Sequence, residues 1–346
     1  MACLFWAPPP GPALDTRSGR VINRVSGARR SPGAVMLLRM NARTRSWHRA
    51  NTYAHDVFPA ERLSADREYT VSVCLPARNE ARTIGPILQE LMPLRELGVV
   101  DQIVVVDRSS DGTAQIARSH GAEVHLQDDL MPELGPVLGK GDAMYRALPI
   151  LTGEVVCFLD ADSEHFGAHF ACGVLGPVLC RPEISFVKGF YRRPFRFGET
   201  TVPDGGGRVT ELTARPLLNL FYPELAGVRQ PLAGEIAARR ELLERLPFAT
   251  GYGVDIGLLI DAYSAAGLDA VAQVDLELRQ NAHQALRDLG PMAYAVLRAV
   301  AVRLEREGRL HGPLPATFTA SDFDTPHVAV AEPVERPPLR SLRAAA

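Results

Sequence analysis

Two aspartates, Asp160 and Asp162, have the types and spacing that best suit chemistry, and they follow the apolar run 154–159. In an extended backbone, residues i and i+2 project to the same side, so both carboxylates can face one hard divalent cation. Such a cation can bridge the oxygens of a diphosphate. A DxD triplet alone is weak evidence, because Asp162 or Ser163 can equally cap a following helix.

A lysine between two glycines, Lys140, stands at the start of a helix that we expect over 142–151. The run 135–141 resembles a phosphate-binding P-loop, but it has one residue too few between its glycines and no Ser or Thr after the lysine, which excludes that motif. The ammonium can still meet a phosphate at a helix N-terminus, unless it is simply an exposed loop lysine. Only Lys140 and Lys188 are lysines among 38 basic residues.

A second glycine-rich turn, 204–211, runs into another expected helix. Its glycines let backbone N–H groups approach an anion, and Arg208 and Thr210 add a bidentate donor and a hydroxyl. We predict a phosphate cradle here, separate from the crevice at Asp160 and Asp162. A flexible hinge before a helix is the alternative.

Two further turns, 231–235 and 251–255, end in Glu235 and Asp255. Each carboxylate either binds sugar hydroxyls or caps a helix. His283, close to Asn281, is the last titratable candidate. A lone histidine is more often a surface or core residue than a metal ligand.

Alternating strands and helices must position these residues. Continuous apolar strands are typical of parallel sheets that are buried on both faces, and repeated βα units of this length predict a doubly wound sheet. Ligands bind at the carboxyl ends of such strands, where 76–80, 107–111 and 160–162 lie. The expected strands are 70–75, 102–107, 122–126, 154–159, 184–188 and 270–276, and the expected helices are 81–97, 113–120, 142–151, 209–226, 254–266 and 286–307.

The composition excludes several classes of protein. The 346 residues carry a formal net charge of −2 with 46% hydrophobic residues, which fits neither a nucleic-acid-binding tail nor an acidic disordered chain. No apolar run approaches the roughly 18 residues of a membrane span. Five cysteines without a CxxC pair indicate reduced thiols. We therefore expect a cytoplasmic protein with neither nucleic-acid nor membrane partners.

The ordered set of motifs resembles the retaining GT-A glycosyltransferases that make glucosyl-3-phosphoglycerate, with close relatives that make mannosyl-3-phosphoglycerate. The matching stretches are LPARNE (75–80), GKG (139–141), DAD (160–162), VKGFYRRP (187–194), GGGRVTEL (205–212), ARPLL (214–218), PLAGE (231–235), GYGVDIGLLID (251–261) and VERPPLR (334–340).

This resemblance implies an α/β fold of GT-A type: a Rossmann-like, mostly parallel sheet with helices on both faces and an acceptor-binding C-terminal half. It implies a hexosyltransferase that moves glucose from UDP- or GDP-glucose to 3-phosphoglycerate with Mg²⁺ or Mn²⁺, in a homodimer. The alternative within the family is mannose transfer from GDP-mannose. The parts expected are a disordered arm or sequence upstream of a later start at Met36 or Met40 (1–66), a nucleotide-sugar half (67–190), an acceptor half (191–311) and an extended tail (312–346).

Carried over by position, the resemblance assigns the site residues. The donor would contact Pro76, Ala77, Arg78, Asn79, Glu80, Arg108, Lys140, Asp160, Ala161, Tyr252, Gly253, Val254, Asp255 and His283. The acceptor 3-phosphoglycerate would contact Gly207, Arg208, Val209 and Thr210. The catalytic candidates are Asp162, Lys140 and Glu235, with Asp162 as the metal ligand.

Three positions depart from the family pattern. Arg78 replaces an apolar residue, and Arg108 replaces a small serine in the nucleoside pocket, which leaves uridine and guanosine donors both open. Asn281 occupies the place of the metal-binding histidine. Either His283 takes over as the ligand, or Asp162, phosphates and water hold the metal.

Three other functions compete with this interpretation. A polyisoprenyl-phosphate sugar transferase shares the first motif and the DxD, but would need a membrane-apposed helix and leaves the 204–211 turn unexplained. A nucleotidyltransferase would need a glycine-rich loop directly after the first strand. A catalytically silent sugar-nucleotide-binding regulator would bind donors without turnover.

Overall fold

The computed structural model describes residues 41–65, 67–197, 200–202, 205–280, 284–312, 315, 317–321, 326–330 and 334–345. The chain divides into two units, Met1–Arg39 and Met40–Ala346, and every described residue lies in the second. Among the described residues, no helix has the length and apolar character needed to cross a membrane.

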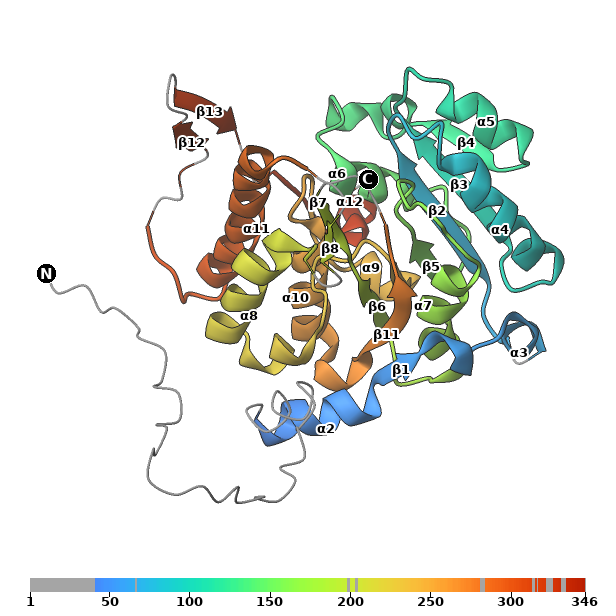
Figure 1. The fold of residues 1–346 in the computed structure, drawn as a ribbon, viewed down its shortest axis with the longest axis horizontal. Helices are drawn as coiled ribbons and strands as arrows, with labels where there is room; N and C mark the ends of the chain where they lie inside the picture. The colour runs from blue at the N-terminus through green and yellow to red at the C-terminus, as the bar shows by residue number, and fades with distance from the viewer. Residues whose placement is uncertain are drawn as a thin grey trace, which may run out of the picture. The chain divides into compact units, whose positions relative to one another are not determined.

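An eight-stranded sheet is the scaffold of the described unit (Figure 1). Its order is β1-β11-β6-β9-β5-β2-β3-β4, and every pair is parallel except those that β9 makes with β5 and β6. The strands are β1 (Thr52–Ala54), β2 (Val71–Ala77), β3 (Gln102–Asp107), β4 (Glu123–Leu126), β5 (Val155–Phe158), β6 (Phe186–Arg192), β9 (Ile236–Arg239) and β11 (Val271–Leu278). The expected mostly parallel α/β sheet is confirmed.

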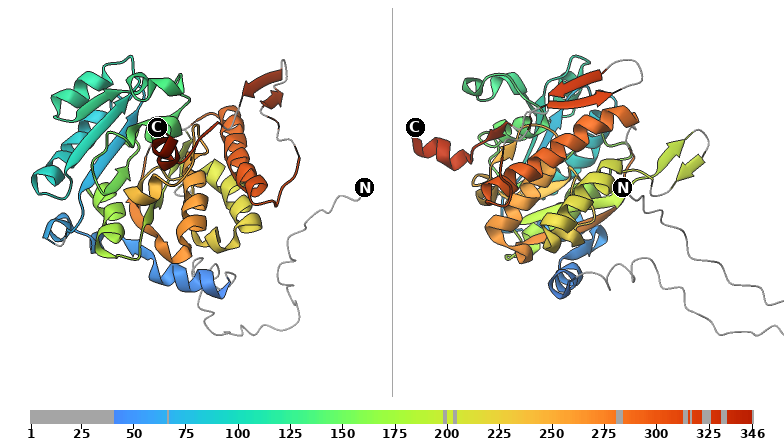
Figure 2. Two further views of the ribbon diagram at one scale, coloured as in Figure 1. Left: turned by 180° about the vertical axis from the view of Figure 1, so that it is seen from behind. Right: turned by 90° about the vertical axis from the view of Figure 1, so that its left-hand side faces the viewer.

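Helices cover both faces of this sheet, as the apolar strands require (Figures 1 and 2). In β2, Val73 and Leu75 belong to one buried cluster and Cys74 to another, because alternate side chains point to opposite faces. The first cluster includes residues of α4 (Ile84–Glu96), α5 (Thr113–Ser119) and α7 (His169–Cys180). The second includes residues of α6 (Lys140–Ala147), α8 (Arg215–Phe221), α10 (Val254–Ala266) and α11 (Leu286–Arg306).

In the second half of the chain, one expected helix is divided and one strand was not expected. The helix expected over 209–226 is a π-helix over Thr210–Ala214, then α8, then a 3₁₀-helix over Pro223–Gly227. Pro216 and Pro223 contribute to this division, because proline lacks the N–H that a continuous helix uses. Strand β9 was missed because only four residues follow the turn 231–235 before the chain enters α9 (Arg240–Leu243).

The expected disordered arm through residue 66 is wrong for residues 41–65. They form α2 (Ala42–Ala50), β1, a 3₁₀-turn over His55–Val57 and α3 (Ala60–Ala65). The indole of Trp47 is 2% exposed and donates a hydrogen bond of 2.7 Å to the carbonyl of Val271, and β1 extends the sheet beside β11. A single large apolar residue among the arginines of α2 leaves too little periodicity to detect. Residues 1–40 lie outside the described residues.

The C-terminal segment is not only an extended tail. It contains the hairpin β12–β13 (Thr317–Ser321, Pro326–Val330), the short strand β14 (Glu335–Arg336) and α12 (Leu339–Ala345). Strand β14 pairs with β10 (Phe248–Ala249), next to the start of α6. A second hairpin, β7–β8 (Phe195–Phe197, Thr200–Val202), follows β6 and extends away from the sheet in Figure 2.

Candidate active site

One pocket of about 810 Å³ lies at the carboxyl ends of the parallel strands. Most of the predicted site residues line it. These are Pro76, Ala77, Arg78, Asn79, Glu80, Arg108, Lys140, Asp160, Ala161, Asp162, Gly207, Arg208, Val209, Thr210, Tyr252 and Asp255. The phosphate cradle expected to be separate therefore shares one continuous pocket with the DxD crevice. Gly253, Val254 and Glu235 are not among the lining residues, and Asn281 and His283 lie outside the described residues.

The loops after β2 and β3 are tied together at one end of this pocket. The backbone N–H of Asn79 donates to the Ser109 hydroxyl at 2.7 Å, and the Asn79 side chain accepts from the Ser110 N–H at 3.0 Å. The N–H of Glu80 donates to the Thr113 hydroxyl at 2.9 Å. Asn79 has a φ of 61°, a left-handed conformation that asparagine tolerates better than most residues. These bonds fix the loop that the sequence assigns to the nucleoside.

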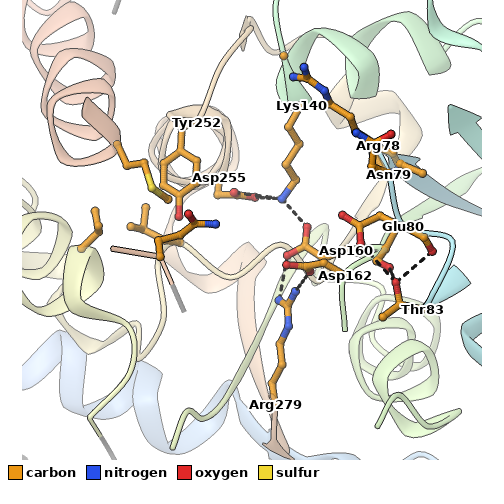
Figure 3. Close-up of a pocket in the computed structure, with 18 of the residues that line it drawn as sticks. Arg78, Asn79, Glu80, Thr83, Lys140, Asp160, Asp162, Tyr252, Asp255 and Arg279 are labelled. Atoms are coloured by element: carbon orange, nitrogen blue, oxygen red, sulfur yellow. Dashed lines mark hydrogen bonds and ion pairs between the residues drawn. The ribbon is translucent and has the colours of Figure 1, made fainter. Parts of the chain in front are cut away.

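Glu80, in the same loop, has a raised pKa. Burial and the neighbouring carboxylate of Asp162 raise the pKa of Glu80 to about 7. The hydroxyl of Thr83 lies 2.6 Å from the carbonyl of Ala161, which joins the start of α4 to the DxD segment (Figure 3). The loop and the DxD therefore form one acidic wall whose charge varies near neutral pH.

Arg108 connects two parts of the pocket wall. Its guanidinium donates to the carbonyl of Val137 at 3.1 Å and lies 3.4 Å from the carboxylate of Asp128. Val137 belongs to the loop that leads into α6. The residue that departs from the family pattern therefore lies where the loop after β3 meets the Lys140 loop.

The ammonium of Lys140 lies between two carboxylates (Figure 3). It is 2.7 Å from Asp160 and 3.3 Å from Asp255. Burial disfavours the charged amine, but these two carboxylates raise the pKa of Lys140 above its usual range, so it remains a cation. The lysine thus connects the end of β5 to the first turn of α10.

Glycines allow Lys140 to reach this position. Gly139 has a φ of 134°, which side chains rarely adopt, and a Cβ on Gly141 would lie 1.9 Å from the carbonyl oxygen of Ala249. The start of α6 can therefore pack directly against strand β10. This close approach is a structural reason for glycine on both sides of the lysine.

Arg279, at the end of β11, holds the acidic side chains of the site together. Its guanidinium lies 2.9 Å from Asp160, 2.5 Å from Asp162 and 2.8 Å from Glu235, and it donates to the Tyr191 hydroxyl at 2.7 Å. The side chain is 2% exposed. Burial opposes ionisation of Asp160, but Lys140 and Arg279 hold its pKa well below its usual range.

Glu235 lies beneath the pocket rather than on its surface. It is fully buried, and burial raises the pKa of its carboxyl group, although Arg279 opposes the shift. Gly234 next to it packs against Asp160, because a Cβ there would lie 2.2 Å from both carboxylate oxygens. Glu235 therefore acts on the pocket through its neighbours, among them Arg279 at 2.8 Å.

The glycine-rich turn faces these residues across the same pocket. Gly207 has a φ of 70°, and the N–H of Gly206 donates to the carbonyl of Arg193 at 2.9 Å. The Arg208 guanidinium donates to the Gln284 carbonyl at 2.6 Å and lies 5.1 Å from the ring centre of Phe195. An arginine has five N–H donors, so this position retains capacity for an anion.

The pocket contains part of a ligand set for a divalent cation. Asp162 supplies carboxylate oxygens on the pocket surface, with a side chain that is 45% exposed, and hard cations prefer such ligands. Within the described ranges, no group of three or more His, Cys, Asp or Glu residues could hold a metal ion. Among the described residues, Asp162 would hold a divalent ion, with its remaining ligands coming from outside this set.

Three residues that line the pocket are not among the candidates predicted from the sequence: Arg279, Tyr191 and Arg193. Arg279 had a detectable signal, because it follows the predicted strand 270–276 at the edge where ligands bind. Tyr191 and Arg193 lie at the end of β6 and just beyond it. Applying the strand-end rule to β6 and β11 would have found all three.

Several known proteins are similar to this chain in sequence and in fold. Residues 72–171 match the sequence profile of glycosyl transferase family 2. The glucosyl-3-phosphoglycerate synthase of Mycolicibacterium smegmatis is 41% identical over 301 residues, which cover 86% of this chain and 96% of the relative. The Mycobacterium tuberculosis enzyme of the same name is 40% identical over 338 residues, covering 95% and 99%.

Solved structures agree. The mannosyl-3-phosphoglycerate synthase from Rubrobacter xylanophilus superimposes with a TM-score of 0.80 at 48% identity, covering 88% of this chain and 99% of that one. The Mycobacterium tuberculosis glucosyl-3-phosphoglycerate synthase in complex with Mn²⁺, UDP-glucose and phosphoglyceric acid superimposes with a TM-score of 0.71 at 42% identity, covering 82% and 94%. With its fold, its pocket and its sequence in agreement, this chain belongs to the glucosyl-3-phosphoglycerate synthase family of glycosyltransferases.

Proposed function

We propose that this protein transfers glucose from a nucleoside-diphosphate glucose to 3-phosphoglycerate and forms glucosyl-3-phosphoglycerate. The observation that carries the proposal is the continuous pocket, in which Lys140 and the DxD segment share one space with Arg208 and its glycine-rich turn. Two anionic substrates can therefore meet in it. A relative that is 42% identical binds UDP-glucose and phosphoglyceric acid together.

The donor half of the pocket has groups for a diphosphate. Lys140 at the start of α6 and Arg279 at the end of β11 are cations that line the pocket, and both can donate to phosphate oxygens. Asp162 would hold Mg²⁺ or Mn²⁺, which neutralises charge on the departing nucleoside diphosphate when it is bound. Arg108 and the loop 76–80 surround the nucleoside.

The acceptor half binds the second anion. Backbone N–H groups of the turn 207–210 and the guanidinium of Arg208 bind the phosphate of 3-phosphoglycerate. Thr210 is 7% exposed and lines the pocket, where its hydroxyl adds a further donor. This arrangement leaves the acceptor hydroxyl free to face the sugar.

The transfer breaks the bond between the sugar C1 and the diphosphate oxygen and forms a bond from C1 to the acceptor hydroxyl oxygen, whose proton passes to the departing diphosphate. The family's retention of configuration requires attack from the face that the diphosphate leaves. Asp255 and Tyr252 line the pocket beside Lys140 and are placed to hold sugar hydroxyls. Glu235 acts through Arg279, since its carboxylate is fully buried.

Mannose transfer from GDP-mannose is the second candidate. It is favoured by the mannosyl-3-phosphoglycerate synthase of Rubrobacter xylanophilus, which is 48% identical to this chain. Arg108 in the nucleoside part of the pocket favours neither base by itself.

One assay matrix tests both functions. UDP-glucose, GDP-glucose and GDP-mannose are each offered with 3-phosphoglycerate in the presence of Mg²⁺, Mn²⁺ or a chelator, and the product is identified by mass spectrometry. We expect a glucosyl product that requires a divalent ion. A mannosyl product alone would establish the second candidate, and donor binding without any turnover would support a silent regulator.

Asp162→Ala is the matched variant for this matrix. We expect it to lose most metal-dependent turnover, because the carboxylate of Asp162 lines the pocket just after β5 with a side chain that is 45% exposed. Full metal-dependent activity in this variant would remove the metal assignment.

We also propose a homodimer and a cytoplasmic location. The described cysteines Cys74, Cys157, Cys172 and Cys180 are free thiols, which suits a reducing compartment. Light scattering of the purified protein and cell fractionation test the two proposals separately.

A further inference from the structure

Lys188 is a buried lysine beneath the floor of the pocket. It lies in the middle of β6, paired with Ile236 of β9 and Gln273 of β11, and is 1% exposed. Moving an ammonium out of water costs several kcal/mol unless polar groups compensate. All basic residues of the chain other than Lys140 and Lys188 are arginines, if histidine is left aside. The lysine at position 188 therefore indicates that a compact cation is needed here.

The ammonium of Lys188 joins two segments of the pocket wall. It donates to the carbonyl of Ala233 at 2.5 Å and lies 3.5 Å from the backbone carbonyl of Asp255. Ala233 follows Leu232, a pocket residue in the turn 231–235, and Asp255 lies in the first turn of α10. In the part of the chain that the structure describes, Lys188 forms no salt bridge. Backbone carbonyls, rather than a carboxylate partner, therefore hold this charge in place.

The two segments carry side chains that face the substrates. Leu232 and the carboxylate of Asp255 both line the pocket, and Asp255 also binds Lys140 at 3.3 Å. On the other side of the turn, Gly234 packs against Asp160. A shift of the turn or of α10 would therefore move the groups around the transferred sugar.

We propose that Lys188 is a positioning residue for the transfer reaction, and that its ammonium fixes the turn 231–235 against the first turn of α10. This inference rests on the proposed function, because it assigns Lys188 a role in that reaction. Lys188 touches no substrate, so it acts through Leu232 and Asp255.

The charge of Lys188 depends on its surroundings. The pKa of Lys188 is lowered to about 8, chiefly by burial and in part by the ammonium of Lys140, although the carboxylates of Asp255, Glu235 and Asp160 oppose the shift. The amine is thus charged at neutral pH and loses its proton as the pH rises through about 8. A neutral amine is a weaker donor, so the tie to Ala233 should loosen at alkaline pH.

The kinetic test uses Lys188→Met and Lys188→Arg in the full-length enzyme. We expect Lys188→Met to lower kcat about ten- to a hundredfold, the range for losing one charge-assisted hydrogen bond, with the KM for 3-phosphoglycerate changed far less. The wild type should lose kcat above pH 8. Lys188→Arg should keep part of the activity and show no such loss up to pH 9.5, because arginine stays charged.

Gln273→Met is the matched control. Gln273 is also buried and lies beside Lys188 in the sheet, but its side chain bonds Thr52, Gly227 and Arg229 rather than the turn 231–235 or α10. We expect it to lower stability while the loss of kcat above pH 8 persists. A wild-type kcat in Lys188→Met, or an alkaline loss that persists in Lys188→Arg, would overturn the proposal. A wild type without turnover on any donor would instead refute the proposed function.

A direct measurement covers the case in which Lys188→Met does not fold. With only two lysines in the chain, ¹³Cε-lysine labelling gives two NMR signals, and Lys188→Arg assigns them. We expect one signal to titrate with a midpoint near pH 8 and the signal of Lys140 to remain that of an ammonium at that pH. Two signals that both titrate in the ordinary lysine range would contradict the proposed environment of Lys188.

Discussion

Arg279 is the residue that organises the acidic side chains of the site. Its buried guanidinium forms ion pairs with Asp160, Asp162 and Glu235 and donates a hydrogen bond to the hydroxyl of Tyr191. Without it, these carboxylates would repel one another, and Glu235 would be left as an uncompensated buried group. The DxD geometry that the sequence indicates is therefore maintained by a residue on a different strand.

Arg208 is expected to act on the acceptor rather than on the donor. Arg208→Ala should raise the KM for 3-phosphoglycerate about ten- to a hundredfold, because charge-assisted hydrogen bonds are worth about 1.5–3 kcal/mol. The KM for the nucleotide sugar should change little. Steady-state kinetics with each substrate varied in turn provides the measurement.

Arg215→Ala is the control for this change. Arg215 bonds Glu211 at 2.8 Å in the same helical segment but does not line the pocket. Equal effects of both substitutions on the acceptor KM, or no effect of either, would argue against the acceptor role of Arg208.

At the level of elements, the C-terminal strand β14 supports the loop that carries Lys140. Arg336 bonds the buried carboxylate of Asp142 at 2.7 and 3.0 Å, and that carboxylate accepts the N–H of Leu138 at 3.0 Å. A segment almost two hundred residues away in sequence thus fixes the start of α6. Strand β14, near the C-terminus, therefore helps to shape the part of the pocket that contains Lys140.

Arg336→Met should destabilise the fold by about 1–3 kcal/mol, because the buried carboxylate of Asp142 loses two hydrogen bonds but keeps its ion pair with Arg146. Burial opposes ionisation of Asp142, but the bonds from Arg336 and Leu138 lower its pKa. The stabilisation is therefore present above the ordinary aspartate pKa of about 4 and is lost as the pH falls below it. Urea unfolding at pH 7 and pH 4 measures both effects.

Arg340→Met tests the same segment without a buried partner. Arg340 is 48% exposed and lies 3.8 Å from Glu244, so its loss should cost at most about 1 kcal/mol. A similar loss of stability in both variants would show that the tail, rather than the Arg336 pair, is responsible.

For the whole molecule, the segment 41–65 supplies β1, which is the edge strand of the sheet beside β11, and the helix α2. Trp47→Ala should lower the free energy of unfolding by about 3–5 kcal/mol, because it removes a buried indole and its hydrogen bond to Val271. Arg49→Ala, on the exposed side of α2, should change it by less than about 0.5 kcal/mol. Chemical denaturation compares the two, and an unchanged stability in Trp47→Ala would contradict the role of α2.

The sequence predicts the parts of this fold that have strong local patterns. Strands β2, β3 and β5 are continuous apolar runs, and α10 matches the expected helix 254–266. Strand β9 and helix α2 lack such patterns. The first is only four residues long, and the second is held by tertiary contacts of Trp47 with Val271 and of Thr44 with Glu224. Short elements of this kind depend on partners that are distant in sequence.

In the candidate site, too, some features have a local sequence pattern and others do not. The strand-end rule and the family motifs locate Asp160, Lys140 and Arg208, since local sequence specifies their loops. The ties that fix these residues, such as Arg279 to Asp160 and Arg336 to Asp142, join positions more than a hundred residues apart. Such ties have no local signal, and three-dimensional packing alone shows them.

Lys140 and Arg279 are already bonded to carboxylates in the site. An incoming diphosphate must therefore exchange one anionic partner for another, and this exchange yields little net attraction. A divalent ion that arrives with the nucleotide supplies the missing positive charge, so ion and nucleotide should enhance each other's binding by the same factor. The dissociation constant of the donor should then fall as the concentration of the divalent ion rises.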